Sequence, residues 1–174
     1  METAATGNSR ISIREMREED LEQVIRIEHE IFLFPWSIIN FSDSIRAGYH
    51  CRVLIQPGAG SGTEPGAKPD TEISGADVVA GYGILMVGPG EAHVLTLGVG
   101  FAWQNQGLGG KMLHHLIELS REHQADYVLL DVRESNTGAA NLYRRLGFQQ
   151  IAVRKGYYPA MCGREDALVM RLEL

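Results

Sequence analysis

The sequence predicts an α/β protein built around a mixed sheet. Short apolar runs typical of strands alternate with longer segments in which apolar residues recur at helical spacing. Some neighbouring strands are separated only by turns and others by a whole helix, which combines hairpins with a strand–helix–strand unit. We expect a single domain over residues 1–174, a length that is sufficient to bury a core.

Local signals place the individual elements. Residues 11–14 are predicted to form a strand, and residues 18–32 a helix. After the turn Phe34-Pro35-Trp36-Ser37, Ser37 is a typical helix N-cap, so a second helix should extend to Ala47. The remaining expected strands are 51–55, 78–87, 93–99, 127–132, 149–154 and 167–172, and the remaining helices are 108–123 and 136–146.

Residues 56–74 are rich in Pro, Gly and Ser and contain few bulky apolar side chains. They separate two strands that would otherwise form a hairpin. The segment is therefore predicted to be a mobile surface insertion, with a ligand-binding loop as the alternative.

Composition limits the classes of function. The net charge of −6 argues against nucleic acid as the main ligand, because phosphate-backbone binding requires clustered Lys and Arg. No apolar run is long enough to span a membrane, and Met1–Arg10 does not resemble a signal peptide, so we expect a cytoplasmic protein. Cys51 and Cys162 are too far apart in sequence for a Cys-x-x-Cys motif, and the histidines show no metal-binding spacing, so no metal is expected.

The most informative segment is the glycine-rich stretch Gln104–Gly110, between an expected strand and an amphipathic helix. Such a turn leaves the first N–H groups of the helix free to bind phosphate. The dinucleotide-binding motif is excluded because Met112 stands where its third glycine is needed, and the P-loop because Asn105 replaces a glycine. The segment is then either a phosphate cradle or a flexible connection.

Asp131 lies within residues 127–132, a run that is suited to a strand buried on both faces. A carboxylate in such a strand is costly unless it is paired or used in chemistry. We therefore expect either a catalytic carboxylate or a salt bridge to Arg133 or Arg154.

Two further polar residues have both structural and functional interpretations. Asn136 is a typical helix cap whose side-chain amide could in addition hydrogen-bond a ligand. Tyr143 shares a helical face with Ala139, Ala140 and Leu146, so it is either a core tyrosine or a phenol that protonates a departing thiolate.

With these residues in view, the chain resembles the GNAT superfamily of N-acetyltransferases from residue 11 to residue 174. The Gln-x-x-Gly-x-Gly pattern that begins at Gln104 is the acyl-coenzyme A cradle of that superfamily. More narrowly, the chain is similar to the RimI type, whose members acetylate the N-terminal alanine of a small-subunit ribosomal protein. The other segments that carry the resemblance are 27–28 with 34–37, 132–136, 142–143 with 146–148, and 157–159 with 163–167.

The resemblance implies the GNAT fold: a mixed, mostly antiparallel central sheet flanked by helices, in which two neighbouring strands splay apart and form a cleft for acetyl-CoA. It also implies a role for each matching position, with Asp131 as the general base and Tyr143 as the general acid. Phe34, Trp36, Tyr157 and Tyr158 would bind the peptide. The coenzyme-binding positions would be Leu97, Gly98, Val99, Asn105, Gln106, Gly107, Leu108, Gly109, Gly110 and Asn136.

The chain departs from the family pattern near the predicted cradle and at the base. Asp131 is one methylene shorter than the family's glutamate, so it would reach the amine through an ordered water. Asn105 and Gly110 stand where family members often carry arginine, which leaves the cradle to depend on backbone N–H groups and Lys111.

The predicted function is direct transfer of acetyl from acetyl-CoA to the α-amine of a protein N-terminus, that of a ribosomal protein with N-terminal alanine, by a monomer or weak dimer. One alternative is a GNAT enzyme that acetylates a small amine or a lysine side chain. Another is a coenzyme A-binding module without turnover. The pair of Asp131 and Tyr143 favours an enzyme, because a binding module needs neither a buried carboxylate nor a phenol beside it.

Overall fold

The structure is a computed structural model that describes residues 11–58 and 77–174. Seven strands form one sheet. They are β1 (Ser12–Glu15), β2 (His50–Gln56), β3 (Val78–Gly88), β4 (Glu91–Val99), β5 (Tyr127–Arg133), β6 (Gln149–Pro159) and β7 (Arg164–Glu173). The helices are α1 (Leu21–Ile31), α2 (Ile38–Arg46), α3 (Leu108–Glu122) and α4 (Thr137–Arg145), with 3₁₀ turns η1 (Glu18–Asp20) and η2 (Phe101–Trp103).

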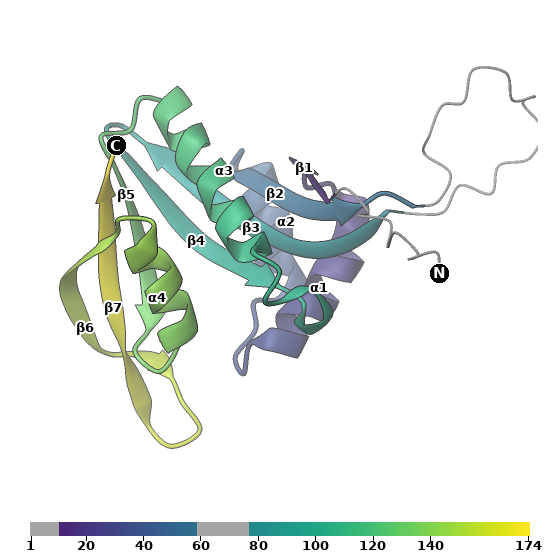
Figure 1. Ribbon diagram of the computed structural model, residues 1–174. Coiled ribbons are helices and arrows are strands. Elements are labelled where there is room, and N and C mark those ends of the chain that lie inside the picture. The colour runs from purple at the N-terminus through teal and green to yellow at the C-terminus, as the bar shows by residue number, and fades with distance from the viewer. Residues whose placement is uncertain (1–10, 59–76) are drawn as a thin grey trace, which may run out of the picture.

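The sheet has the strand order β1-β2-β3-β4-β5-β7-β6. Helices α1 and α2 cover one face, and α3 and α4 cover the other (Figure 1). Each face has its own core. Phe41 of α2 is buried with Val53 and Tyr82 of the sheet on one face, whereas Met112 and Leu116 of α3 are buried against the opposite face.

All neighbouring strands are antiparallel except β4 and β5. These two run parallel and pair only from Glu91 with Tyr127 to Val94 with Leu130. Beyond these residues the strands diverge, while β4 remains paired with β3 as far as Val99. The predicted splay of two neighbouring strands in a mixed sheet is therefore confirmed.

The boundaries agree with the sequence prediction where local signals define them. Ser37 caps α2, because its hydroxyl accepts a hydrogen bond from the Asn40 amide at 3.4 Å. The first predicted helix is divided, since residues 18–20 form the turn η1 and only residues 21–31 are α-helical. Strands β6 and β7 are longer than expected.

Strand β5 is not buried on both faces, so that expectation was wrong. Val128, Leu130 and Val132 are buried, while the residues between them, including Asp131, are only partly buried. The alternation arises because α3 packs on one face of β5, whereas α1 and α2 on the other side of the sheet pack chiefly against β2, β3 and β4. Only residues 56–58 of the predicted insertion 56–74 belong to the described part of the chain. Within residues 11–58 and 77–174, none of the helices is both long and apolar enough to cross a membrane.

Candidate active site

Two cavities lie along the gap between β4 and β5. The first has a volume of about 560 Å³ and lies between the start of α3 and α4. The second has a volume of about 390 Å³ and lies nearer to the α1–α2 connection and the end of β6. Phe32, Leu97 and Asn136 line both cavities. A ligand that extends along β4 can therefore occupy both.

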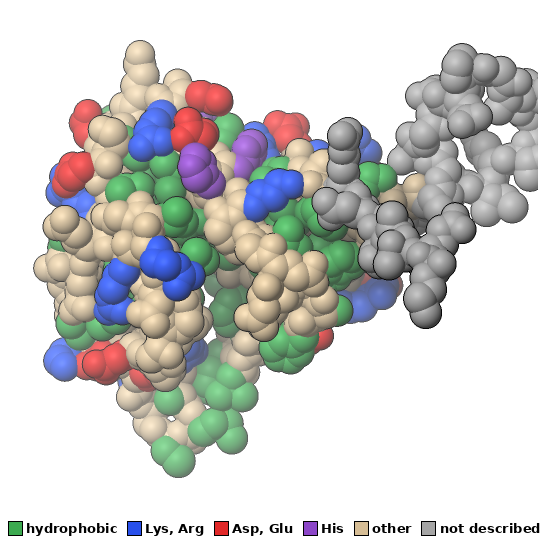
Figure 2. Space-filling view, in the orientation of Figure 1, with side chains coloured by type: hydrophobic (Ala, Val, Ile, Leu, Met, Phe, Trp, Pro, Cys, Tyr) green, Lys and Arg blue, Asp and Glu red, His purple; other side chains and the backbone are tan. Residues whose placement is uncertain are grey.

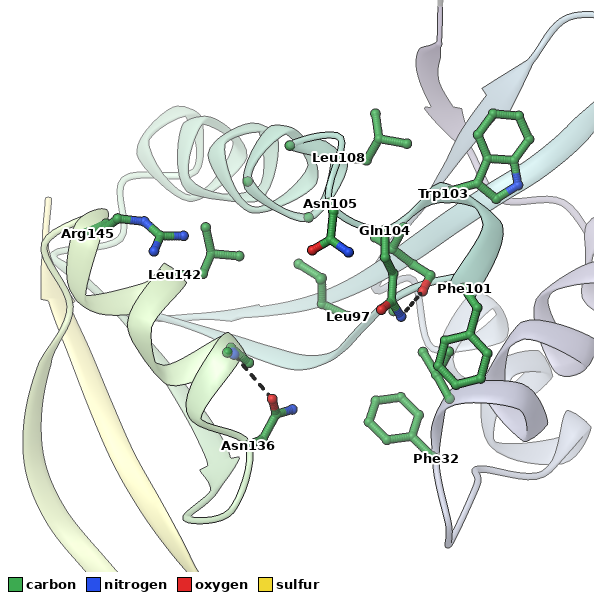
Figure 3. A pocket seen from close by; sticks show the side chains of 18 residues that line it. Phe32, Leu97, Phe101, Trp103, Gln104, Asn105, Leu108, Asn136, Leu142 and Arg145 are labelled. Carbon is green, nitrogen blue, oxygen red and sulfur yellow. Dashed lines mark hydrogen bonds between the residues drawn. The ribbon is translucent and has the colours of Figure 1, made fainter.

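The glycine-rich turn forms one end of the first cavity (Figure 3). Asn105 and Gly107 have positive φ angles of 61° and 78°, which turn the chain sharply into α3. The Lys111 amide donates to the Gly107 carbonyl at 3.0 Å and makes the first intrahelical bond. The amides of residues 108–110 precede it and have no acceptor within the helix, so this helix start can bind an anion.

Most of the predicted coenzyme-binding residues line this cavity. Gln106 does not: its side-chain amide donates to the Ala102 carbonyl at 3.2 Å. Gln104 holds the turn against β4, because its amide donates to the Val99 carbonyl at 2.9 Å. The predicted residues that do line the cavity are Leu97, Gly98, Val99, Asn105, Gly107, Leu108, Gly109, Gly110 and Asn136.

Helix α4 closes this cavity opposite the turn. A Cβ atom on Gly109 or Gly110 would lie 3.5 Å from the Leu142 side chain, so the two helices approach closely here. Lys111 does not line the cavity, and its ammonium donates instead to the Ile11 carbonyl. The structure therefore does not place Lys111 in the cradle, and its expected contribution there stays a prediction. The cation that faces this cavity is Arg145 of α4, which the sequence analysis missed.

The second cavity brings together the residues predicted to bind a peptide. Phe34 and Trp36 come from the α1–α2 connection, and Tyr157 and Tyr158 from β6. Asp131 lines the same cavity from β5. Four aromatic side chains thus share this cavity with a carboxylate at the point where the strands separate.

The Asp131 carboxylate has two basic neighbours and is mostly buried, with 11% of its side chain exposed. Oδ1 lies 3.3 Å from Arg154 Nε, and Oδ2 lies 3.6 Å from His93 Nε2. The Arg154 contact lacks hydrogen-bond geometry, and Oδ1 has no hydrogen-bond partner among the described residues. Of the two arginines considered as salt-bridge partners, Arg154 is the neighbour. The carboxylate still has acceptor capacity for a ligand.

Tyr143 and Asn136 both belong to the α4 region. Burial raises the pKa of Tyr143 to about 12, so its phenol keeps its proton at neutral pH. Tyr143 packs beside Phe148, with 6.0 Å between ring centroids, and is not among the residues that line the two cavities. The Asn136 Oδ1 caps α4 by accepting from the Ala139 amide at 3.2 Å. Because Asn136 also lines both cavities, the capping role leaves its Nδ2 group for a ligand.

Glu28 is a buried site residue to which the sequence analysis assigned no role. It is 1% exposed and lines the second cavity from α1. Its Oε1 accepts from the Trp36 amide at 2.8 Å, and its Oε2 accepts from the Tyr82 hydroxyl. Burial raises the pKa of Glu28. The sequence did hold a sign of this role, because Glu28 lies on the apolar, buried side of the amphipathic helix α1.

Arg133 and Glu165 support the aromatic wall and were also missed as site residues. The Arg133 guanidinium lies 4.4 Å from the Tyr158 ring centroid, within cation–π distance, and bonds Glu165 Oε2 at 3.1 Å. Glu165 Oε1 accepts from the Ser135 amide at 2.7 Å. These bonds tie the β6–β7 hairpin to the end of β5.

The arrangement combines an anion-binding helix start, an open β4 edge and a carboxylate in an aromatic cavity. From Leu95 to Val99, β4 has no β5 partner, so its backbone groups on that side are available to a ligand, apart from the Val99 carbonyl that Gln104 binds. Such a site can hold a long phosphorylated ligand and place its far end beside Asp131.

Comparisons with known proteins agree with this geometry. Residues 21–148 match the model of the "Acetyltransferase (GNAT) family". The chain is 31% identical to the [ribosomal protein bS18]-alanine N-acetyltransferase of Escherichia coli K12, over 94% of this chain and 97% of that protein. It is 27% identical to a protein of Bacillus subtilis named as a putative [ribosomal protein bS18]-alanine N-acetyltransferase, over 93% and 95%. The crystal structure of the ribosomal-protein-S18-alanine N-acetyltransferase from Escherichia coli superposes with a TM-score of 0.76, at 31% identity and over 94% of each chain.

Proposed function

The chain belongs to the GNAT family of acetyltransferases, and from this membership we propose that it transfers acetyl from acetyl-CoA to the α-amine of a protein N-terminus. The natural substrate that we propose is the N-terminal alanine of ribosomal protein bS18, the residue named for its Escherichia coli relative. The observation that carries the proposal is the meeting of the two cavities at Leu97 and Asn136, with an anion-binding helix start in one and Asp131 in the other.

In this proposal the first cavity holds acetyl-CoA, which supplies the acetyl group as a thioester. The free amides at the start of α3 bind the diphosphate. The open edge of β4, at Leu97, Gly98 and Val99, aligns the pantetheine arm, and Asn136 adds a side-chain contact. Backbone N–H groups on this edge also polarise the thioester carbonyl.

The second cavity holds the first residues of the peptide substrate. Phe34, Trp36, Tyr157 and Tyr158 form its aromatic walls. Asp131 accepts the proton of the α-amine, directly or through one water. The task is modest, because the reference pKa of an α-amine is about 7.7–8.0 and a weak base suffices near neutral pH.

Transfer then requires one bond to form and one to break. The amine nitrogen bonds to the acetyl carbon, and the carbon–sulfur bond breaks. In this proposal Tyr143 gives its proton to the departing thiolate, a role that rests on its match to the family's general-acid position, since its side chain lines neither cavity. The protein itself carries no acetyl group at any stage, so Asp131 and Tyr143 act only on protons.

The partner in this reaction is the N-terminal segment of a protein. A ribosomal-protein substrate would be met in the cytoplasm, and a monomer or weak dimer would suffice because the proposed site is built from one chain. A GNAT enzyme for a small amine or for lysine side chains remains the second candidate. It is less well supported, because the two relatives reported above are both named for an N-terminal alanine substrate.

The test is an acetyl-transfer assay with acetyl-CoA and short peptides. One series begins with Ala, Ser, Met or Gly, and the controls are an N-terminally blocked lysine peptide and a polyamine. We expect the highest kcat/KM for the alanine peptide. Preferential turnover of the blocked lysine peptide or the polyamine would contradict the proposal, and tight coenzyme binding without turnover of any amine would indicate a binding module.

A further inference from the structure

Arg145 is the only charged residue among the described residues that line the first cavity. In the proposed function this cavity holds acetyl-CoA, whose diphosphate is anionic. The glycine-rich turn contributes no cationic side chain to the cavity, because its lining residues are Gln104, Asn105 and glycines, followed by Leu108. Backbone amides alone would then face the diphosphate, unless a cation reaches it from another element.

Helix α4 contributes Arg145 to the lining of the first cavity. Leu142 lies within contact distance of Cβ positions on Gly109 and Gly110, so its face of α4 packs against the first turn of α3. Arg145 follows Leu142 by three residues and therefore shares that face. Figure 3 shows the Arg145 side chain pointing from α4 toward Leu142, which lies between it and the start of α3. In Figure 2, basic side chains gather over α4 beside the hollow that separates it from α3.

Arg145 is also free to bind a ligand. Among the described residues it makes no ion pair and no side-chain hydrogen bond, and it is exposed. Two other basic residues nearby do make hydrogen bonds within the protein. Arg144 donates to Asn141 Oδ1 at 3.2 Å, and Lys111 of α3 donates to the Ile11 carbonyl.

We propose that Arg145 binds the diphosphate of acetyl-CoA from the α4 side and supplies the positive charge that the glycine-rich turn lacks. This inference rests on the proposed function. A guanidinium suits the role because its planar fork of N–H donors can bond two phosphate oxygens at once. The diphosphate would then lie between the α3 amides on one side and Arg145 on the other.

Calorimetric titration of acetyl-CoA into the full chain tests the proposal. Loss of a charge-assisted hydrogen bond should weaken binding by roughly 10- to 100-fold in Arg145→Ala. Arg145→Lys should fall between this variant and the wild type, because it keeps the charge but loses the fork. The matched control is Arg144→Ala on the same turn of α4, which should bind as the wild type does.

Two further ligands define which phosphate is bound. Dephospho-coenzyme A lacks the 3′-phosphate but keeps the diphosphate, so Arg145→Ala should lose affinity for it by the same factor. Acetyl-pantetheine lacks all phosphates, so wild type and variant should bind it equally.

Three results would overturn the proposal. They are unchanged affinity of Arg145→Ala for acetyl-CoA, an equal loss in Arg144→Ala, and a loss that disappears with dephospho-coenzyme A, which would assign Arg145 to the 3′-phosphate. Failure of the proposed function would look different. Either the wild-type protein itself would not bind acetyl-CoA, or it would bind acetyl-CoA without acetylating a peptide N-terminus, and in that second case the comparison of Arg145→Ala with wild type would still report on the diphosphate.

Discussion

Asp131 Oδ2 lies 3.6 Å from His93 Nε2, across the last paired residues of β4 and β5 before the strands separate. His93 pairs with Leu129, and Asp131 is the first β5 residue beyond the final pair. The carboxylate thus lies where β4 and β5 stop pairing and a ligand can enter between them. This position connects the strand splay to the proposed chemistry.

The pH dependence of an Asp131→Asn variant tests its role as the base. Turnover should fall most at pH values below the pKa of the substrate α-amine, where a proton must be removed. The loss should be smallest above that pKa, where free amine is abundant. The measurement is a pH profile of kcat/KM with a peptide that begins with alanine.

Asp131→Glu is the matched variant, since it keeps the carboxylate and restores the longer reach. It should retain most of the activity. A loss in Asp131→Asn that is equal at every pH, together with a lower Tm, would instead assign Asp131 to a structural ion pair with Arg154.

Tyr143→Phe should keep the fold and the affinity for acetyl-CoA but lower turnover by roughly 10²–10⁴-fold, the range typical of lost general acid catalysis. The ring remains packed beside Phe148, and only the hydroxyl is removed. Steady-state kinetics and calorimetry on the same preparation separate the two effects. Normal turnover with intact binding would make Tyr143 a core residue whose hydroxyl takes no part in catalysis.

Gly109→Val should weaken acetyl-CoA binding, because a branched side chain would occupy the cavity at the start of α3. The fold should survive, since a Cβ at this position meets Leu142 at an ordinary distance of 3.5 Å. Lys111→Ala is the control on the same helix and should bind normally, because Lys111 does not line the cavity. Calorimetric titration with acetyl-CoA checks this prediction. Equal affinities of Gly109→Val and wild type would contradict the assignment of the diphosphate to this turn.

Glu28→Gln should change the pH dependence of stability. Burial raises the pKa of Glu28, so the folded chain binds this proton more tightly than the unfolded chain. Its contribution to the free energy of unfolding therefore falls as pH rises from the ordinary glutamate pKa toward the raised one. Glutamine cannot ionise, so the variant should gain stability relative to wild type as pH rises through that window.

Urea denaturation of both proteins at a series of pH values checks this prediction, with Glu22→Gln on the exposed face of α1 as the control. A stability difference between Glu28→Gln and wild type that stays constant with pH would contradict it.

Much of the fold was predictable because its signals are local. Ser37 caps α2 through a hydrogen bond to Asn40, only three residues away. The ends of β6 and β7 could not be placed in this way. Arg164 binds the Gly156 and Tyr157 carbonyls across the hairpin, and Asp166 accepts from the Gly156 amide. These contacts extend both strands beyond the apolar segments that sequence patterns detect.

The sequence motifs of the candidate site could be recognised, whereas the charged side chains that face its cavities were harder to predict. The glycine turn and the aromatic residues were identified because their residue types are distinctive. Arg145 was missed because its role depends on how α4 packs against α3. Glu28 was missed because its partner Tyr82 lies 54 residues away in sequence. Lys111 lies outside the lining of the first cavity, which the sequence could not show because it does not tell which way a helical lysine points.

The most direct test of the proposed function is to locate the acetyl group on a peptide that offers both kinds of amine. The peptide begins with a free N-terminal alanine and carries one internal lysine, and it is incubated with acetyl-CoA and the full chain. Tandem mass spectrometry then identifies the acetylated nitrogen. We predict acetylation of the alanine α-amine, with the lysine unmodified and with the product greatly reduced in Tyr143→Phe. Acetylation confined to the lysine side chain would contradict the assignment of this site to protein N-termini.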